Sequence, residues 1–210
     1  MLYPEEFFDV TVCPFKDLFL LDKPVWETLK HLDSYINKQS LGKISIKIPE
    51  CVYLINPELI SIVKETKIYP GACLEGPCIL GDHVEIGPGA YIRPYSLIGN
   101  GVKIGHSSEV KHSIILNEAK APHFNYIGDS ILGQGVNLGA GVICANFKIN
   151  KTEVVIKIGK EKYATGLKKL GAIIGDQSFL GCNSVISPGT VLKKEFLCLP
   201  CTHVCGACLS

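Results

Sequence analysis

The feature that most constrains this chain is a six-residue period that begins near residue 44. Large aliphatic side chains occupy every sixth position, in an unbroken series, at Ile62, Ile68, Leu74, Leu80, Ile86, Ile92, Ile98, Ile104, Val110 and Leu116. Four residues after most of these stands a small or β-branched residue, and Gly, Pro, Asp and Asn fill the turns. Hexapeptide repeats of this kind are typical of a parallel β-helix, whose short strands each direct one large and one small side chain inward. The period resumes at Ile174, Leu180, Ile186, Leu192, Cys198 and Val204, so we predict an all-β solenoid.

Composition agrees with a solenoid and excludes several classes of protein. The chain has 210 residues, of which 21 are glycines, and glycine turns the corners between strands at little steric cost. With 47% hydrophobic residues and a net charge of +1, the chain is expected to be neither disordered nor a basic nucleic-acid binder. No apolar stretch approaches the ~18 residues of a membrane helix, and no basic signal-peptide start is visible. We therefore expect a cytoplasmic protein whose ten cysteines are thiols.

Residues 1–43 follow a different pattern and form a predicted helical lead-in to the β-helix. Asp22 is the predicted N-cap of one helix, and Pro24 lies in its first turn. An apolar stripe then follows at helical spacing and consists of Val25, Trp26, Leu29, Leu32 and Ile36. We therefore divide the chain into a lead-in over 1–43 and a β-helix over 44–210.

Two interruptions of the period mark where function is expected. The first lies between Leu116 and Leu138, which are 22 residues apart, a spacing that is not a multiple of six. The second covers residues 145–172, which match no inward pattern and are predicted to leave the β-helix as one extruded loop. Within this loop Thr152–Ile158 alternates like a strand, and Gly159 with Lys160 would turn a small hairpin.

The first interruption gathers polar residues that can carry chemistry. Lys120–Asp129 contains His123, Asn125, Tyr126 and Asp129. Upstream stand Arg93, Glu109 and Lys111, and downstream stand Asn137 and Asn146. Histidine is the usual general base near neutral pH, a carboxylate can orient it, and Arg and Lys favour phosphate or carboxylate substrates. By spacing alone, these residues could equally be exposed corner residues on a polar flank, and that alternative stays open.

The segment Gly81–Gly141 resembles the acetyltransferase domain of a known bifunctional family, N-acetylglucosamine-1-phosphate uridyltransferase/glucosamine-1-phosphate acetyltransferase. The matching strings are Ile-Arg-Pro (92–94), Glu-Val-Lys (109–111), Lys-Ala-Pro-His-Phe-Asn-Tyr-Ile-Gly-Asp (120–129) and Gly-Val-Asn-Leu-Gly-Ala-Gly (135–141). The string from Thr165 to Asp176 is more similar to a sister group in which a sugar-1-phosphate nucleotidylyltransferase domain precedes the β-helix. The resemblance covers about residues 44–200. It implies a left-handed parallel β-helix.

The resemblance also implies an acetyl-CoA-dependent N-acetyltransferase that acts on an amino-sugar 1-phosphate in nucleotide-sugar biosynthesis of the UDP-N-acetylglucosamine type. The implied catalytic residues are His123 as general base, Glu109 as its orienting carboxylate, and Asn146 facing the substrate. The implied substrate-binding residues are Arg93 and Lys111 on the phosphate, Tyr126 and Asn137 on the sugar, and a loop lysine, here Lys151 with Lys148 and Lys157 as alternatives. The implied acetyl-CoA contacts are Ala140 and Cys182. Family members are trimers with active sites between subunits, so a homotrimer is implied, and no metal is needed for acetyl transfer.

The chain departs from the resembled family in two ways. Residues 1–43 lack a Gly-rich phosphate-binding start, so we expect no nucleotidylyltransferase activity from this chain alone. Phe147 follows Asn146 where the family usually has a tyrosine. These departures keep open a second hypothesis, a non-catalytic β-helix that oligomerises or regulates a separate nucleotidylyltransferase partner. The sequence does not choose between glucosamine and galactosamine phosphates.

The C-terminus offers a tempting metal motif. Cys198, Cys201, Cys205 and Cys208 surround His203, which suggests zinc or an iron–sulfur cluster. The six-residue period continues through this segment, however, and the central spacer of three residues is short for a two-knuckle zinc site. We therefore predict a terminal β-coil without metal. The remaining histidines are too irregularly spaced for a metal-dependent β-helical carbonic anhydrase and are expected on the surface.

Overall fold

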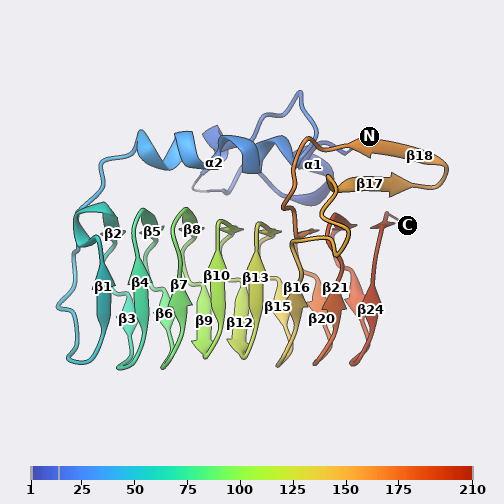
Figure 1. The fold of residues 1–210 in the computed structure, drawn as a ribbon. Coiled ribbons are helices and arrows are strands. Elements are labelled where there is room, and N and C mark those ends of the chain that lie inside the picture. Colours follow the sequence, from blue (N-terminus) through green and yellow to red (C-terminus); the bar gives the residue numbers. More distant parts are fainter. Residues whose placement is uncertain (1, 14, 210) are drawn as a thin grey trace.

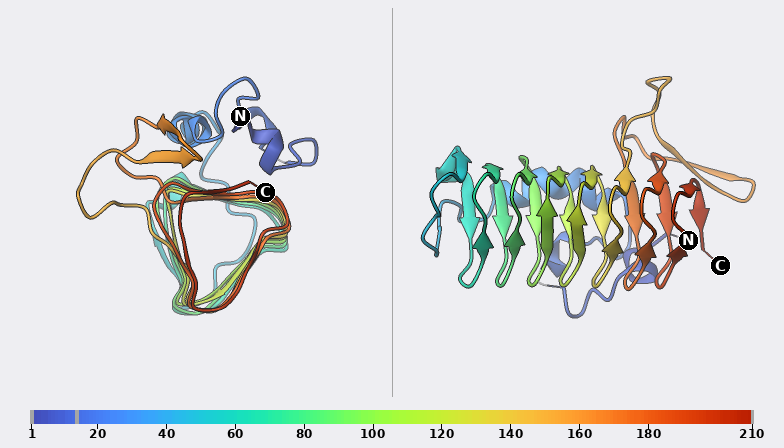
Figure 2. Two further views of the ribbon diagram at one scale, coloured as in Figure 1. Left: turned by 90° about the vertical axis from the view of Figure 1, so that its right-hand side faces the viewer. Right: turned by 90° about the horizontal axis from the view of Figure 1, so that it is seen from below.

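The computed structural model, which describes residues 2–13 and 15–209, shows the repeat wound into a left-handed parallel β-helix of triangular cross-section (Figure 1; Figure 2). Three parallel sheets, numbered I to III here, form the three walls. A helical segment lies along one wall, and a two-stranded hairpin projects from the solenoid (Figure 2). The predicted fold class is therefore confirmed: an all-β left-handed β-helix with a short N-terminal helical segment and one extruded loop.

The strands follow one another regularly along each wall. Sheet I consists of β1 (Tyr53–Ile55), β4 (Cys73–Glu75), β7 (Tyr91–Ile92), β10 (Glu109–Lys111), β13 (Tyr126–Gly128), β16 (Ile143–Cys144), β21 (Val185–Ile186) and β24 (His203–Val204). Sheet II consists of β2 (Ile60–Ile62), β5 (Cys78–Leu80), β8 (Ser96–Ile98), β11 (Ile114–Ile115), β14 (Ile131–Leu132), β19 (Ala172–Ile174), β22 (Thr190–Leu192) and β25 (Ala207–Cys208). Sheet III consists of β3 (Lys67–Ile68), β6 (Glu85–Ile86), β9 (Lys103–His106), β12 (Lys120–His123), β15 (Asn137–Leu138), β20 (Phe179–Leu180) and β23 (Leu197–Cys198). The extruded hairpin pairs β17 (Val155–Ile158) with β18 (Glu161–Ala164).

The inside of the prism is a continuous core of the aliphatic residues that the period predicts. Ile62, Leu80 and Ile98 stack in register on sheet II, and the corresponding residues of sheets I and III close the core. Each coil is eighteen residues long where it is regular, as between Thr66 and Val84. Stacking at this spacing lets each coil satisfy its backbone N–H and C=O groups through its neighbours.

The predicted inward position of Leu116 is wrong, because the coil shortens before it. Val110 is followed inward by Ile115, five residues later, and Ile127 is followed by Leu132 with the same short step. Leu116 instead joins a second hydrophobic cluster outside sheet II. Both short steps, at 111–113 and 128–130, lie at the corner between sheets I and II. The extruded loop leaves the β-helix at this same corner, between β16 and β19.

The N-terminal residues cover the outer face of sheet II. They form α1 (Pro4–Phe7), the 3-10 turn η1 (Lys16–Leu18) and α2 (Glu27–Asn37), and the turn η2 (Pro57–Leu59) lies in the first coil. The predicted N-cap at Asp22 is wrong: Glu27 N–H bonds to Pro24 O in a tight turn, so α2 begins at Glu27 with Trp26 as its cap. The apolar stripe of α2 packs on Leu97, Ile114, Ile131, Ile173 and Val191. Sheet II is therefore buried on both faces, and its strands have consecutive aliphatic residues.

The C-terminal segment forms strands β23, β24 and β25 and closes the solenoid as its last coil. All ten cysteines are free thiols. Within the described residues, no group of three or more His, Cys, Asp or Glu side chains is placed to hold a metal ion. None of the described helices is long and apolar enough to span a membrane.

Candidate active site

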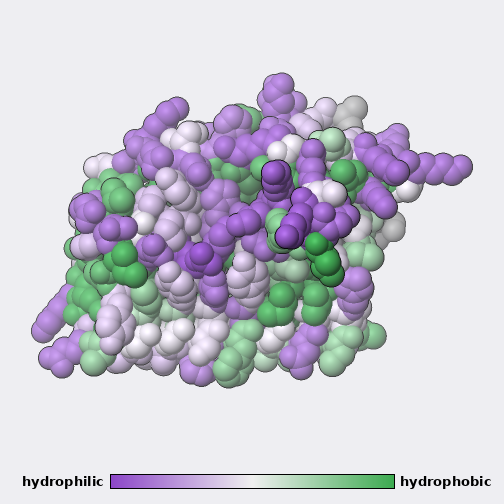
Figure 3. Space-filling model, viewed as in Figure 1, coloured by the Kyte–Doolittle hydropathy of each residue, from purple (hydrophilic) through white to green (hydrophobic). Residues whose placement is uncertain are grey.

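An open pocket of 430 Å³ lies on the outer face of sheet I, near its corner with sheet II, and its lining side chains are Arg93, Lys111, Tyr126, Asn146, Phe147 and Lys169. The first four come from successive coils, just at or after strands β7, β10, β13 and β16. Side chains alternate across a strand, so Lys111 points outward while its neighbour Val110 is buried in the core. On the face shown in Figure 3, hydrophilic side chains gather in the middle, and hydrophobic side chains lie on both sides of them. The structure thus brings four of the predicted site residues into one pocket.

Arg93 and Glu109 form the first ion pair of the site. Arg93 Nη1 donates to Glu109 Oε1 at 2.8 Å, and the guanidinium lies 5.7 Å from the centre of the Tyr91 ring. Both partners are about one-third exposed, which leaves the remaining guanidinium N–H groups free to bind a ligand. Burial, with the Glu109 carboxylate as a second cause, raises the pKa of Tyr126. The Tyr126 phenol is therefore a protonated hydrogen-bond donor at neutral pH.

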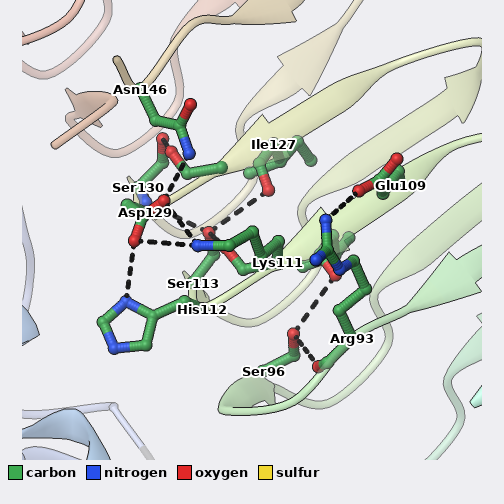
Figure 4. Close-up of polar contacts among 12 residues, drawn as sticks. Arg93, Ser96, Glu109, Lys111, His112, Ser113, Ile127, Asp129, Ser130 and Asn146 are labelled. Carbon is green, nitrogen blue, oxygen red and sulfur yellow. Dashed lines mark hydrogen bonds and ion pairs between the residues drawn. The ribbon is translucent and has the colours of Figure 1, made fainter. Parts of the chain in front are cut away.

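Asp129 is the centre of a second polar cluster (Figure 4). Lys111 Nζ donates to both carboxylate oxygens, at 2.9 and 3.2 Å, and the Asn146 amide donates to Oδ2. His112 Nδ1 lies 3.2 Å from Oδ1. Burial alone would raise the pKa of the Asp129 carboxyl, but its contacts with His112, Lys111 and Asn146 outweigh burial and lower it. Asp129 therefore holds the lysine and the amide of the pocket in fixed positions.

The shortened corners are held by buried serines and a glycine. Ser113 Oγ donates to Lys111 O at 2.8 Å and accepts from Ser130 N at 3.0 Å, and Ser130 Oγ donates to Gly128 O at 2.7 Å (Figure 4). A Cβ on Gly128 would lie 2.7 Å from both Tyr126 Oη and Asn146 Nδ2. Only glycine fits between these two pocket side chains without displacing them.

His123 lies at a different edge, the corner between sheets III and I. It ends β12, its side chain is exposed, and its C=O accepts from Gly141 N at 3.0 Å. The next coils place Ala140 and then Cys182 at the same corner, since Asn183 N donates to Ala140 O at 2.8 Å. The predicted general base and the two predicted acetyl-CoA contacts therefore form one column along this edge. Glu109 is engaged with Arg93, and within the described chain it forms no hydrogen bond to the His123 ring.

Asn125 connects the column that contains His123 to β10, the strand that carries Glu109 and Lys111. Its side chain is buried; its Oδ1 accepts from His123 N at 3.1 Å, and its Nδ2 donates to Gly139 O at 2.8 Å. Glu109 N in turn donates to Asn125 O at 2.8 Å. The sequence prediction grouped Asn125 with the polar chemistry, whereas the structure gives it the role of fixing the corner between His123 and Tyr126.

The remaining predicted residues lie apart from the pocket. Asn137 is on sheet III, paired with Lys120. Lys151 is exposed in a left-handed turn of the extruded loop, with a φ of 58°. The loop lysine that lines the pocket is Lys169, which the sequence analysis missed; it pairs with Phe147 in an antiparallel bridge at the loop's exit. No local sequence pattern indicates this position, because the bridge joins the two ends of the long loop.

Comparisons with known proteins agree with this architecture. The family described as "GMPPB C-terminal domain" matches residues 53–161, slightly more than half of the chain. A bifunctional sugar-1-phosphate nucleotidylyltransferase/acetyltransferase of Sulfurisphaera tokodaii is 37% identical over 158 residues, covering 75% of this chain and 38% of the relative. The bifunctional protein GlmU of Methanococcus maripaludis is 42% identical over 91 residues, covering 43% of this chain and 22% of the relative. The chain thus spans less than half the length of these relatives.

Among solved structures, one match is a mutant GDP-perosamine N-acetyl transferase from Caulobacter crescentus in complex with CoA and GDP-perosamine. Its TM-score is 0.37 and its sequence identity is 13%, with 76% of this chain and 55% of that chain covered.

Proposed function

The chain belongs to the GMPPB C-terminal domain family, and we propose that within this family it is an acetyl-CoA-dependent N-acetyltransferase that acts on an amino-sugar 1-phosphate. The observation that carries the proposal is the pocket on sheet I, which combines Arg93, Lys111 and Lys169 with Tyr126 and Asn146. The similarity to bifunctional nucleotidylyltransferase/acetyltransferases supports the reaction class. The product would serve nucleotide-sugar synthesis of the UDP-N-acetylglucosamine type.

The charges of the pocket suit a phosphate group. Three cations, Arg93, Lys111 and Lys169, face two carboxylates, Glu109 and Asp129, which hold the first two cations in place. The three cations exceed the two carboxylates by one positive charge, so the pocket can attract a phosphate dianion. Tyr126 and Asn146 then provide neutral donors beside the phosphate, where the hydroxyl groups of a sugar would lie.

The chemistry we propose is a direct transfer between bound substrates. The sugar amine attacks the thioester carbonyl of acetyl-CoA, the C–S bond breaks, and the coenzyme leaves as a thiolate that takes up a proton. His123 accepts the proton that the amine loses, because histidine is the usual general base near neutral pH and this side chain is exposed. Ala140 and Cys182 continue the column beyond His123 as small side chains, and we assign this edge to the coenzyme.

The predicted roles of the other residues remain part of the proposal. Glu109 orients Arg93 directly, and through its backbone it bonds to the corner next to His123. Lys169 takes the place of the predicted Lys151 as the loop lysine on the substrate. Asn137, on sheet III, would contact substrate bound across a neighbouring subunit.

We further propose that the protein is a cytoplasmic homotrimer, with residues 1–43 as a lead-in unit and residues 44–210 as the β-helix. Ile149, in the first part of the extruded loop, is fully exposed, and Phe124 beside the His123 corner is 56% exposed. Large apolar side chains at these places would be covered if neighbouring subunits met along the edge that carries His123.

The direct test is a measurement of free CoA released from acetyl-CoA. The purified protein should release CoA with glucosamine-1-phosphate or galactosamine-1-phosphate, and the faster of the two identifies the sugar. N-acetylglucosamine-1-phosphate is the matched control because it keeps the phosphate but has no free amine. Absence of release with both amino sugars, from protein of verified oligomeric state, would overturn the proposal.

A second candidate is a non-catalytic β-helix that oligomerises or regulates a separate nucleotidylyltransferase. It is favoured by the engagement of Glu109 with Arg93, since His123 then has no carboxylate partner among the residues that the structure describes. Capture of a nucleotidylyltransferase by the purified protein, together with no measurable CoA binding, would favour this candidate over the enzyme.

A further inference from the structure

A continuous series of contacts connects the N-terminal helix to the floor of the pocket. Asp33 of α2 lies 2.7 Å from His112 Nε2, and the other ring nitrogen, Nδ1, lies 3.2 Å from Asp129 Oδ1. Asp129 in turn binds Lys111 and Asn146, both of which line the pocket. Figure 4 shows His112 directed at the Asp129 carboxylate from the side opposite Asn146.

The placement of His112 is set by the shortened corner between sheets I and II. His112 has a φ of 46° where the coil loses a residue, so its side chain turns toward the covering helix. Its Nδ1 atom is fully buried and, at its angle to Asp129, makes an ion-pair contact that falls short of a hydrogen bond. The edge of the ring faces Tyr95 at 6.2 Å between ring centres. A buried ring nitrogen facing a buried carboxylate requires an explanation, because such groups are normally fully paired.

We propose that His112 is a positioning residue for the pocket: held by Asp33 of α2, it fixes Asp129 in the orientation that presents Lys111 and Asn146 to the substrate. The inference rests on the proposed function, because it assigns the pocket to a phosphorylated amino sugar. It gives the N-terminal helix a role in substrate binding beyond covering sheet II. The role is indirect, since His112 does not line the pocket.

The charge of His112 makes this arrangement dependent on pH. The groups that face the ring are Asp33 from α2, Asp129 from the next coil and the Tyr95 ring, and the neighbouring Lys111 shares the Asp129 carboxylate. Burial alone would lower the pKa of His112, but the carboxylates of Asp129 and Asp33 outweigh burial and raise it. The imidazolium therefore holds Asp129 fully below the ordinary histidine pKa of about 6.5, and this contact is lost as the pH rises through the raised pKa of His112.

The experiment measures the dissociation constant of glucosamine-1-phosphate by calorimetry, for the full chain, from pH 6 to pH 9. We expect His112→Gln to weaken binding ~5–30-fold at pH 7, the loss typical of one charge-assisted contact, and to remove the weakening that the wild type shows as the pH rises. Asp33→Asn should weaken binding less, because it removes the contact between Asp33 and His112 but keeps the contact between His112 and Asp129. The matched control is His83→Gln, since His83 pairs with Asp82 at 3.2 Å at an exposed corner without a contact to the pocket.

The outcomes separate this inference from the proposed function. Unchanged binding in His112→Gln, or the same pH dependence as the wild type, would overturn the positioning role. Binding without CoA release in the wild type would overturn the acetyltransferase but leave the effect of His112 measurable. Where His112→Gln fails to fold, Asp33→Asn supplies the test, because Asp33 is exposed. If the wild type binds no sugar phosphate, the NMR titration of His112 decides: an imidazole pKa that is not raised, or is unchanged by Asp33→Asn, rejects the proposal.

Discussion

Sheets I and II are built from the same repeat, yet the outer face of sheet II is covered by protein and that of sheet I is open to solvent. On sheet II the outward positions carry aliphatic residues such as Leu97, Ile131 and Ile173, and the N-terminal segment and the hairpin bury them. On sheet I the outward positions around the pocket carry Arg93, Lys111 and other polar residues, and this part of the face stays open to solvent. The inward residues of the two sheets are alike, because both serve the same core.

This difference shows where function is encoded in a solenoid. The inward-facing aliphatic residues specify the fold but take no part in binding or catalysis. The outward-facing residues determine whether a wall is covered by protein or binds a ligand. The two walls meet at one corner, and several irregularities of the repeat lie there, among them the two short steps at 111–113 and 128–130 and the extruded loop. Asp129 and His112 are at this corner, where the covered wall and the open wall contact each other.

The largest effect is expected at the His123 corner. His123→Ala should reduce the rate of acetyl transfer ~10²–10⁴-fold, because it removes the proposed general base. His106→Ala is the matched control: His106 pairs with His123 in the preceding coil and is also exposed. Equal losses in both variants, in assays of CoA release, would show that the column acts only as a structural edge.

The two faces can be compared by deleting one aliphatic side chain from each. Ile131→Ala on sheet II should lower the free energy of unfolding by about 2–5 kcal/mol, because the side chain is completely buried in the second core. Val185→Ala on sheet I, where the side chain is 41% exposed, should cost less than about 1 kcal/mol. Denaturant unfolding of both variants measures the difference, and similar costs would contradict the division between a covered and an open wall.

Asp129 tests the corner where the walls meet. Asp129→Asn should destabilise the protein by about 2–4 kcal/mol at pH 7, because Lys111 and His112 lose their buried partner. The pKa of the Asp129 carboxyl is lowered, so its contribution is present above the unfolded value of about 4 and is lost as the pH falls through the lower folded value. The gap between wild type and variant in denaturant unfolding should therefore narrow below about pH 4.

A control for that measurement is Asp82→Asn, which removes a partly exposed corner carboxylate and should cost no more than about 1 kcal/mol. If the difference in free energy of unfolding between the wild type and Asp129→Asn were the same at pH 7 and in acid, this result would contradict the pairing of the Asp129 carboxylate with Lys111 and His112.

The smallest effect distinguishes two lysines of the extruded loop. Lys169→Ala should raise the KM for the sugar phosphate ~5–20-fold, since Lys169 lines the pocket. Lys151→Ala should change the KM less than ~2-fold, because Lys151 lies in an exposed turn away from it. Steady-state kinetics of the two variants decides the assignment, and the reverse order would restore the original prediction for Lys151.

Much of the fold was predictable because the repeat is local. Each six-residue unit contains its own large aliphatic residue, so the inward positions from Ile62 to Val110 could be predicted without knowledge of the rest of the chain. The pocket residues Arg93, Lys111, Tyr126 and Asn146 were predictable as a set from the polar strings that resemble a known family. Their convergence on one face follows from the alternation of side chains along stacked strands.

The errors have physical causes that the period does not contain. Ile114, Ile115 and Leu116 are three consecutive aliphatics, so a one-residue shortening before them leaves the apparent period intact and hides which one faces inward. The helix α2 begins at Glu27 and not directly after Asp22, because a tight turn at Pro24 precedes it. Lys169 reaches the pocket through pairing at the exit of a long loop, a contact that no local pattern indicates.

The most direct test of the account is the affinity of the sheet I pocket for a sugar with and without its phosphate. Calorimetry should show that glucosamine-1-phosphate binds at least ~10-fold more tightly than glucosamine, because Arg93, Lys111 and Lys169 face the phosphate. Arg93→Gln should remove much of that difference while leaving unfolding nearly unchanged, since the Arg93 side chain is 36% exposed. Equal affinities for the two sugars would contradict the assignment of this pocket to a phosphorylated amino sugar.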